Sequence, residues 1–141
     1  MDAKHLEGIA LFERLSKDQR AEVARQADEI DVEAGKRLVS EGRFGYEFFV
    51  IENGTAEVVR GEEHIADLGP GDFFGEMALL GDTVRNADVI CSTPMTAMVM
   101  TDAAFRSLAR RMPDVAEEIR AACRRRTQEL TNGGAQQQAS A

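Results

Sequence analysis

The sequence has little of what several protein classes require. Its 141 residues include two cysteines, two histidines and no tryptophan. Cys91 and Cys123 do not have the number or spacing of a disulfide framework or a zinc site, so each is predicted to be a small buried apolar side chain. Only His64 falls among the predicted strands, whereas a jelly-roll metalloenzyme needs two or three histidines and a carboxylate.

Nucleophile motifs are missing as well. The serines and cysteines have no histidine and acid arranged around them in a recognisable catalytic motif. We therefore predict no catalytic residue, no metal ligand and no cofactor, and we do not expect an enzyme.

Long hydrophobic runs and an overall basic charge are also absent. No apolar run reaches the ~20 residues that cross a bilayer, and the charged N-terminus does not resemble a signal peptide. The net charge is −8, with 20 acidic and 10 basic residues in 1–101 but 5 acidic and 7 basic residues in 102–141. An acidic body repels anionic membranes and nucleic acid. We expect a cytoplasmic protein that binds no membrane and, alone, no DNA.

Two helical patterns flank a β-rich centre. Ser16-Lys17-Asp18-Gln19 has the form of a capping box and predicts a helix over 16–28. Thr101 or Asp102 can cap a later helix, and Pro113 divides the C-terminal helices within 102–131. A domain over 1–131 and a disordered tail over 132–141 are predicted.

The centre consists of short β-rich runs separated by glycine turns. Asn53-Gly54, between two apolar runs, is the strongest β-hairpin signal. Such spacing predicts a mainly β fold, an antiparallel barrel or jelly roll of about seven or eight strands over 29–100. The predicted strands cover 29–32, 37–40, 47–52, 56–60, 64–68, 87–91 and 96–100.

The segment 69–88 connects two of these strands and is too long for a hairpin. Gly75 lets the backbone approach a ligand, and residues 76–80 can form one helical turn whose first N–H groups face an anion. The planar guanidinium of Arg85 can pair with the same anion. The Glu76 carboxylate would repel this anion and is expected to accept a hydrogen bond from a neighbouring hydroxyl group. A ribose cyclic phosphate offers both groups.

The run Phe74-Gly75-Glu76-Met77-Ala78-Leu79-Leu80, followed by Arg85-x-Ala87, resembles the phosphate-binding cassette of cyclic-nucleotide-binding domains. That family includes the cAMP receptor protein and protein kinase A regulatory subunits, and the resemblance extends from about Leu6 to Leu130. It implies a cassette over 74–88, cAMP or cGMP as the ligand, and a regulatory role transmitted through the C-terminal helices.

The resemblance also implies a role for each cassette residue. Glu76 would accept from the ribose 2′-hydroxyl, and Arg85 would pair with the cyclic phosphate. The C-terminal helix would cover the base with Arg120, Ala121, Cys123 or Arg124. The other predicted ligand-binding residues are Phe74, Gly75, Met77, Ala78, Asn86, Ala87 and Asp88 in the cassette, with Val58 and Leu68 on the barrel wall beside the purine. The side chains of Phe73, Phe74, Leu79 and Leu80 are predicted to anchor the cassette in the core.

Two positions depart from the family pattern. Val84 replaces the usual proline, and Asp88 stands where the family often has Thr or Ser. The Asp88 carboxylate could repel the phosphate or accept from a guanine amino group, so the choice between cAMP and cGMP stays open.

Two other functions stay open, and Asp88 is the main support for the first of them. One is a non-binding domain of the same fold that serves as a structural or dimerisation module, and another is a sensor fragment of a cAMP receptor protein-type transcription regulator. Fewer than a dozen residues follow Leu130, too few for a helix-turn-helix. A protein effector, unidentified from the sequence, is expected, and the last helix could pair with its copy in a homodimer. The basic run at Arg124–Arg126 is either a solvated helix face or a contact surface.

Overall fold

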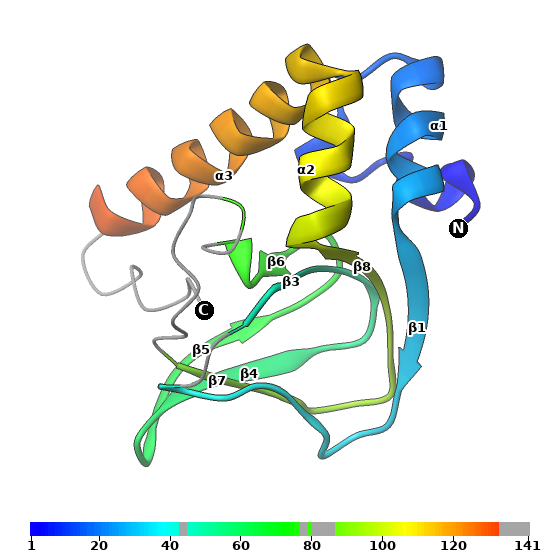
Figure 1. Ribbon diagram of the computed structural model, residues 1–141. Coiled ribbons are helices and arrows are strands. Elements are labelled where there is room, and N and C mark those ends of the chain that lie inside the picture. The colour runs from blue at the N-terminus through cyan, green and yellow to red at the C-terminus, as the bar shows by residue number, and fades with distance from the viewer. Residues whose placement is uncertain (43–44, 77–78, 80–86, 133–141) are drawn as a thin grey trace.

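Two four-stranded antiparallel sheets pack face to face, and a layer of helices covers the outer face of one of them (Figure 1). The computed structural model describes residues 1–42, 45–76, 79 and 87–132, with side chains up to residue 125. The first sheet has the order β1-β8-β3-β6 and the second β2-β7-β4-β5. The strands are β1 (Asp28–Val32), β2 (Arg37–Val39), β3 (Glu47–Asn53), β4 (Ala56–Arg60), β5 (Glu63–Leu68), β6 (Phe73–Phe74), β7 (Asp88–Cys91) and β8 (Met95–Thr101).

The predicted fold class is confirmed in its jelly-roll form, as a sandwich and not as a closed barrel. All seven predicted strands are present, and their ends differ from the prediction by one residue at most. The additional strand, β6, was not predicted. It spans two residues, which is too short for alternation of polar and apolar side chains to reveal it.

The helices are η1 (Ala3–Leu6), η2 (Ala10–Phe12), α1 (Lys17–Gln26), α2 (Asp102–Arg111) and α3 (Pro113–Asn132). The three α-helices begin where the sequence predicts. At α1, Gln19 N–H donates to Ser16 Oγ over 3.1 Å and Ser16 N–H donates to Gln19 Oε1 over 2.8 Å, which completes the capping box. Thr101 Oγ1 caps α2 by accepting from Ala104 N–H over 3.1 Å. The short helices η1 and η2 were not predicted, because three or four residues carry no helical periodicity.

The first sheet separates two hydrophobic clusters. Along β3 and β8, alternate residues face opposite sides. Phe48, Val50, Met98 and Met100 pack under the helices. Phe49, Ile51, Ala97 and Val99 pack against the second sheet. Because both faces are covered, these strands form nearly continuous apolar runs and not an alternating pattern.

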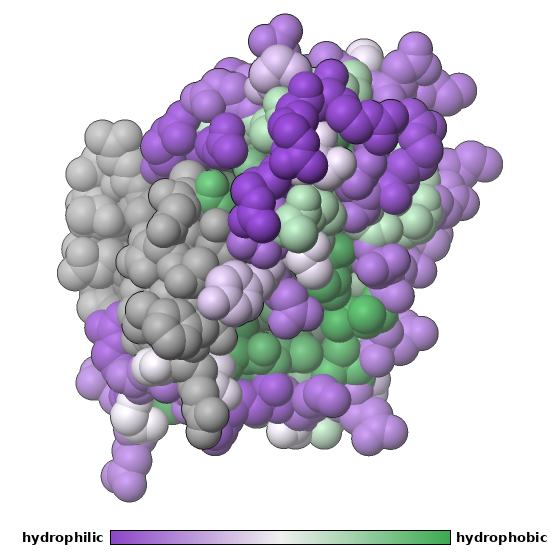
Figure 2. Space-filling view, viewed as in Figure 1, coloured by the Kyte–Doolittle hydropathy of each residue, from purple (hydrophilic) through white to green (hydrophobic). Residues whose placement is uncertain are grey.

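The sandwich is open along one side. β1 and β2 are edge strands of different sheets, and a pocket of about 410 Å³ between them is lined by the half-buried Ile30 and Leu38 among others. The space-filling view shows hydrophilic residues over the helices and hydrophobic residues gathered in the region between the helical layer and the lower sheet (Figure 2). Among the helices that the structure describes, none combines the length and hydrophobicity of a membrane span.

The hairpin predicted at Asn53-Gly54 is wrong. β3 and β4 belong to different sheets and do not pair, so this turn carries the chain from one sheet to the other. The type I′ turn expected of Asn-Gly needs positive φ at both residues, whereas only Gly54 has it, at +93°. A tight hairpin instead joins β4 and β5 through Gly61, with Arg60 opposite Glu63.

The corner at Gly54 packs against the corner that leads from β7 to β8. Thr55 N–H donates to Thr93 Oγ1 over 3.0 Å, and Ser92 N–H donates to the Thr55 carbonyl over 2.9 Å. A Cβ atom added at Gly54 would lie 2.4 Å from the Pro94 carbonyl oxygen. Gly54 therefore provides both a positive φ and the close approach of two backbones.

We expect Gly54→Ala to lower the free energy of unfolding by about 3 kcal/mol or more, because backbone strain adds to a clash with immobile backbone. Gly61→Ala is the matched control. It has φ +62° and nothing within 4 Å of an added Cβ, so strain alone should cost it about 1 kcal/mol. Urea unfolding of both variants measures the difference, and equal losses would refute the packing argument at Gly54.

A charged contact joins α1 to α2. The Glu22 carboxylate is buried, with 4% of the residue exposed. It forms ion pairs with Arg25 of its own helix and with Arg111 Nη1 of α2, the latter at 3.0 Å. The hydrogen bond from Arg25, assisted by the charge of Arg111, holds the pKa of Glu22 below its ordinary value of 4.5.

The lowered pKa gives the contact a defined pH dependence. Stability from a carboxylate of this kind is present above the unfolded pKa and is lost as the pH falls through the folded pKa. We expect Glu22→Gln to be less stable than the wild type at pH 7 and the difference to shrink below pH ~4.5, where Glu22 of the unfolded chain takes up a proton before that of the folded protein does. Urea titrations of both proteins between pH 7 and pH 3 test this. A difference that stays constant over this range would contradict it.

Candidate functional site

The turn before the candidate site is fixed to the first sheet. Asp72 Oδ2 accepts from Gly69 N–H over 2.8 Å. Gly71 N–H donates to the Ile51 carbonyl over 2.8 Å, and Ile51 N–H donates to the Asp72 carbonyl over 2.9 Å. The chain therefore leaves β5, turns against β3 and enters β6 in a defined position.

Two adjacent phenylalanines then anchor the chain on opposite faces of that sheet. Phe74 is fully buried in the sandwich and stacks on Phe49, with ring centroids 4.8 Å apart. Phe73 lies on the helical side, 5.8 Å from Phe48 between ring centroids. The anchoring prediction is confirmed for both. The Phe74 side chain, which was also placed among the ligand contacts, faces the core.

The helical turn predicted after Gly75 begins at Glu76. Gly75 has φ +77°, a conformation that favours glycine. Leu79 N–H donates to the Glu76 carbonyl over 3.0 Å and closes the turn. The Leu79 side chain packs into the hydrophobic cluster under the helices, which confirms that it is an anchor.

The Glu76 carboxylate is buried next to α3. Only 2% of the residue is exposed. Burial raises the pKa of the Cys123 thiol far above its usual range, and the negative charge of Glu76 raises it further. Cys91 is also buried, and burial raises its pKa. Both cysteines are therefore the small buried side chains that were predicted, and Cys123 marks the part of α3 that lies near Glu76.

At the far end of the loop, Asp88 at the start of β7 contacts the neighbouring strand β2 and the residues that follow it. Its Oδ1 accepts from Glu41 N–H over 2.6 Å, and its Oδ2 lies 3.9 Å from Arg37 Nε. The preceding Ala87 is fully buried. Asp88 thus has a structural partner. The family pattern, which often has Thr or Ser at this position, could not reveal it because Glu41 lies 47 residues away in the sequence.

The two residues predicted to contact the purine from the barrel wall lie inside the sandwich. Val58 of β4 is fully buried and Leu68 of β5 is 4% exposed, in the same cluster as Phe74. Val58 pairs with Val89 of β7 and with Ala66 of β5. Their contact with a base remains a prediction.

The predicted lid positions on α3 have different surroundings. Cys123 is buried and faces the inside of the molecule. Arg120 lies over the Phe105 ring, 4.9 Å from its centroid. The exposed Arg124 forms an ion pair with Glu117 on the same helix. The structure therefore gives Arg124 an ion-pair partner on the helix surface, and its contact with ligand remains a prediction.

The remaining cassette positions lie outside the described residues. The structure places Gly75, Glu76 and Leu79 at one end of the loop and Ala87 and Asp88 at the other. The positions not described are Met77, Ala78, Leu80, Val84, Arg85 and Asn86. Their roles stand as predictions.

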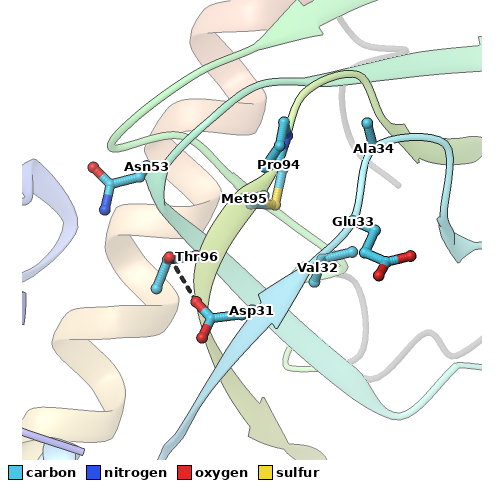
Figure 3. A pocket seen from close by; sticks show the side chains of 8 residues that line it. All are labelled: Asp31, Val32, Glu33, Ala34, Asn53, Pro94, Met95 and Thr96. Atoms are coloured by element: carbon cyan, nitrogen blue, oxygen red, sulfur yellow. Dashed lines mark hydrogen bonds between the residues drawn. The ribbon is translucent and has the colours of Figure 1, made fainter.

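A separate pocket of about 560 Å³ lies at the end of the first sheet near the Gly54 corner (Figure 3). Asp31 and Glu33 contribute two carboxylates, and Asp31 Oδ1 accepts from Thr96 Oγ1 over 2.8 Å. None of its eight described lining residues is basic. Such a lining repels a phosphate, so the Gly75–Asp88 loop is the better candidate for an anionic ligand.

Comparison with known proteins identifies relatives over a part of the chain that includes this loop. Residues 29–112 match the family model described as the cyclic nucleotide-binding domain. The chain is 36% identical over 104 residues to the cAMP-dependent protein kinase regulatory subunit of Schizosaccharomyces pombe, covering 73% of this chain and 25% of that protein. It is 35% identical over 100 residues to the cGMP-dependent protein kinase egl-4 of Caenorhabditis elegans, covering 67% and 13% respectively.

A solved structure shows the same architecture. The Thermus thermophilus Catabolite Activator Protein superposes with a TM-score of 0.76 at 26% identity, over 87% of this chain and 60% of that one. The chain spans a quarter or less of the length of the two kinase proteins.

The contact between Asp88 and the Glu41 amide should contribute to stability. We expect Asp88→Ala to lower the free energy of unfolding by about 1 kcal/mol, since it leaves that N–H without its acceptor. Asp88→Asn keeps an acceptor oxygen and should lose less. Thermal and urea unfolding of the two variants check the order, and an alanine variant as stable as the wild type would show that the contact contributes nothing.

Proposed function

The chain belongs to the cyclic nucleotide-binding domain family, and from that premise we propose that it binds cAMP or cGMP at the loop from Phe74 to Asp88 and transmits ligand occupancy through α2 and α3. The observation that carries this proposal is the Gly75–Glu76 turn, with a positive φ at Gly75 and the Glu76 carboxylate buried near α3. A buried carboxylate accepts hydrogen bonds, and a ribose 2′-hydroxyl at this position could donate one to Glu76.

The phosphate would be bound by the part of the loop that follows Glu76. We assign Arg85 to the cyclic phosphate, because a guanidinium makes paired, charge-assisted hydrogen bonds to phosphate oxygens. The N–H groups of residues around Gly75 and Ala87 would add backbone donors. The names of two relatives mention cAMP and cGMP respectively, which supports a cyclic nucleotide as the ligand class and leaves the base open.

Asp88 is compatible with an anionic ligand in this arrangement. Its two oxygens are directed to Glu41 N–H and Arg37 Nε, and the nearby guanidinium offsets part of its negative charge. The repulsion expected from the sequence is thereby reduced. This observation favours ligand binding over a degenerate, non-binding module.

Signal transmission would follow from the way the loop is anchored. Phe73 and Leu79 pack in the cluster that also contains Phe105 of α2 and Ile119 of α3, so a change in the loop must alter helix packing. A micromolar ligand supplies about 8 kcal/mol in total. Only the difference in its affinity for two helix arrangements can shift their populations.

The output would be carried by a protein partner or by further domains. The kinase relatives are four or more times longer than the matched region, and the domain itself is proposed to be regulatory and not catalytic. A cytoplasmic location, pairing of α3 with its copy and the identity of the effector remain parts of this proposal.

Calorimetry with cAMP and cGMP tests the assignment. We expect Arg85→Ala to weaken binding about 30- to 1,000-fold, equivalent to about 2–4 kcal/mol, because the charge-assisted bonds to the phosphate are lost. Arg106→Ala is the matched control. Arg106 lies on α2 and forms its ion pair with Asp102 at 2.6 Å, so binding should stay unchanged.

Two outcomes would contradict the proposal. Equal affinity of the wild type and Arg85→Ala would reject the role of Arg85. Absence of binding by the wild type at millimolar cAMP and cGMP would favour the structural or dimerisation module.

A further inference from the structure

Three polar side chains from distant parts of the chain meet away from the nucleotide loop. His5 comes from η1, Glu29 from β1 and Glu52 from β3, and one potential ligand atom of each lies within 4.8 Å of the others. His5 Nδ1 is 2.5 Å from Glu29 Oε2 and 3.4 Å from Glu52 Oε1. The N-terminal turn lies beside the beginning of β1 (Figure 1).

The sheet register brings the two carboxylates to the same face. Glu29 is opposite Met98, and Met98 is opposite Val50 on its other side. Directly opposite residues share a face, and Val50 and Met98 belong to the cluster under the helices. Glu52 follows Val50 by two residues, at an irregularity in the pairing of β3 with β8. The first sheet therefore presents both carboxylates to η1.

Glu52 is the unusual member of this cluster. Its side chain is 9% exposed, and its Oε2 is buried with no hydrogen-bond donor among the residues that the structure describes. A buried carboxylate oxygen without a donor or a cation is costly. Burial, followed by a hydrogen bond with the adjacent Glu29 carboxyl group and by its negative charge, raises the pKa of Glu52 to about 7.

We propose that His5, Glu29 and Glu52 form a binding site for a divalent transition-metal ion, with Zn²⁺ as the first candidate. One imidazole nitrogen and two carboxylates are donors that Zn²⁺ accepts. Ca²⁺ takes six or more oxygen ligands, and three residues that include an imidazole do not provide them. Glu52 Oε1 already faces His5 Nδ1, and a metal ion would give the buried Oε2 the partner that it lacks among the described residues.

The distances suit such an ion after a small adjustment. Bonds of about 2.0–2.1 Å in a tetrahedral site place neighbouring ligand atoms about 3.3 Å apart. His5 Nδ1 and Glu52 Oε1 are 3.4 Å apart already. The 2.5 Å separation of His5 and Glu29 would widen on binding. Both side chains can make this movement, because 47% of His5 and 31% of Glu29 are exposed. Their exposure also leaves the fourth position to water.

The surroundings favour a cation. Asp31 and Asp2 add negative charge that acts on Glu52 and His5 respectively. The Met1 ammonium group adds positive charge that acts on Glu29, and it is held by hydrogen bonds to the carbonyl oxygens of Ala24 and Ala27 over 3.0 and 3.3 Å. A bound metal would connect η1 to two strands of the first sheet, so we expect it to stabilise the folded state as well.

The second histidine provides an internal control. His64 lies between Glu57 and Asp67 on the exposed outer face of the second sheet. Its Nδ1 is 3.5 Å from Glu57 and its Nε2 is 3.5 Å from Asp67. The two carboxylates therefore face different nitrogens, and all three side chains are more than 40% exposed. One potential ligand atom of each of these residues also lies within 4.8 Å of the others, but this group has no buried oxygen that lacks a hydrogen-bond partner, as Glu52 has.

The experiment is a titration of the full chain, freed of metal, with ZnCl₂ by calorimetry and with CoCl₂ by visible absorption. We expect one Zn²⁺ per chain and a d–d spectrum typical of low coordination number for Co²⁺. His5→Ala and Glu52→Gln should each weaken Zn²⁺ binding at least tenfold, and His64→Ala should leave it unchanged. Addition of Zn²⁺ should raise the melting temperature of the wild type and not that of His5→Ala.

Two results would overturn the proposal. One is the absence of binding by the wild type at 1 mM metal, and the other is equal binding by His5→Ala and the wild type. The exposed position of His5 makes its variant informative even if Glu52→Gln does not fold. Arg85→Ala should bind Zn²⁺ normally, so failure of this site and failure of nucleotide binding are distinguishable.

Discussion

The structure depends on burial of the first sheet on both faces. One set of side chains on β3 and β8 packs in the sandwich and the other set packs under the helices. Exposure of either set would lower the free energy of unfolding by about 25 cal/mol for each Å² of apolar surface. The sheet is therefore a common wall between two cores. Elements that touch the wall on either side are held in position relative to one another, although they are far apart in the sequence.

The residues that begin the loop 74–88 are anchored at this wall from both sides. Phe74 enters the sandwich and Phe73 the helical cluster, so the two-residue strand β6 fixes the loop to both cores at once. Glu76 and Leu79 then continue toward α3. Because packed interiors resist continuous deformation, a ligand that moves this loop has few ways to be accommodated except by a change in how α2 and α3 pack. This is a physical basis for the regulatory role proposed above.

Local signals in the sequence predicted much of the fold, and long-range relations explain what they missed. The strands and the capping box of Ser16 and Gln19 depend on neighbouring residues, and they formed as expected. The Asn53-Gly54 turn was assigned to a hairpin because local chemistry cannot show that β3 and β4 belong to different sheets. In the candidate site, the motif indicated Gly75, Glu76 and the anchors. It could not indicate that Asp88 binds the distant Glu41 amide, or that His5 meets Glu52.

β1 is an edge strand of the first sheet, and among the described strands only β8 pairs with it. Such an edge can recruit a strand from another molecule and start aggregation. The sequence of β1, with Asp28, Glu29 and Asp31 around a single Ile30, opposes this, because two copies laid edge to edge would bring like charges together. The acidity of this strand thus protects the isolated domain in solution, and any cation that neutralises part of it also weakens that protection.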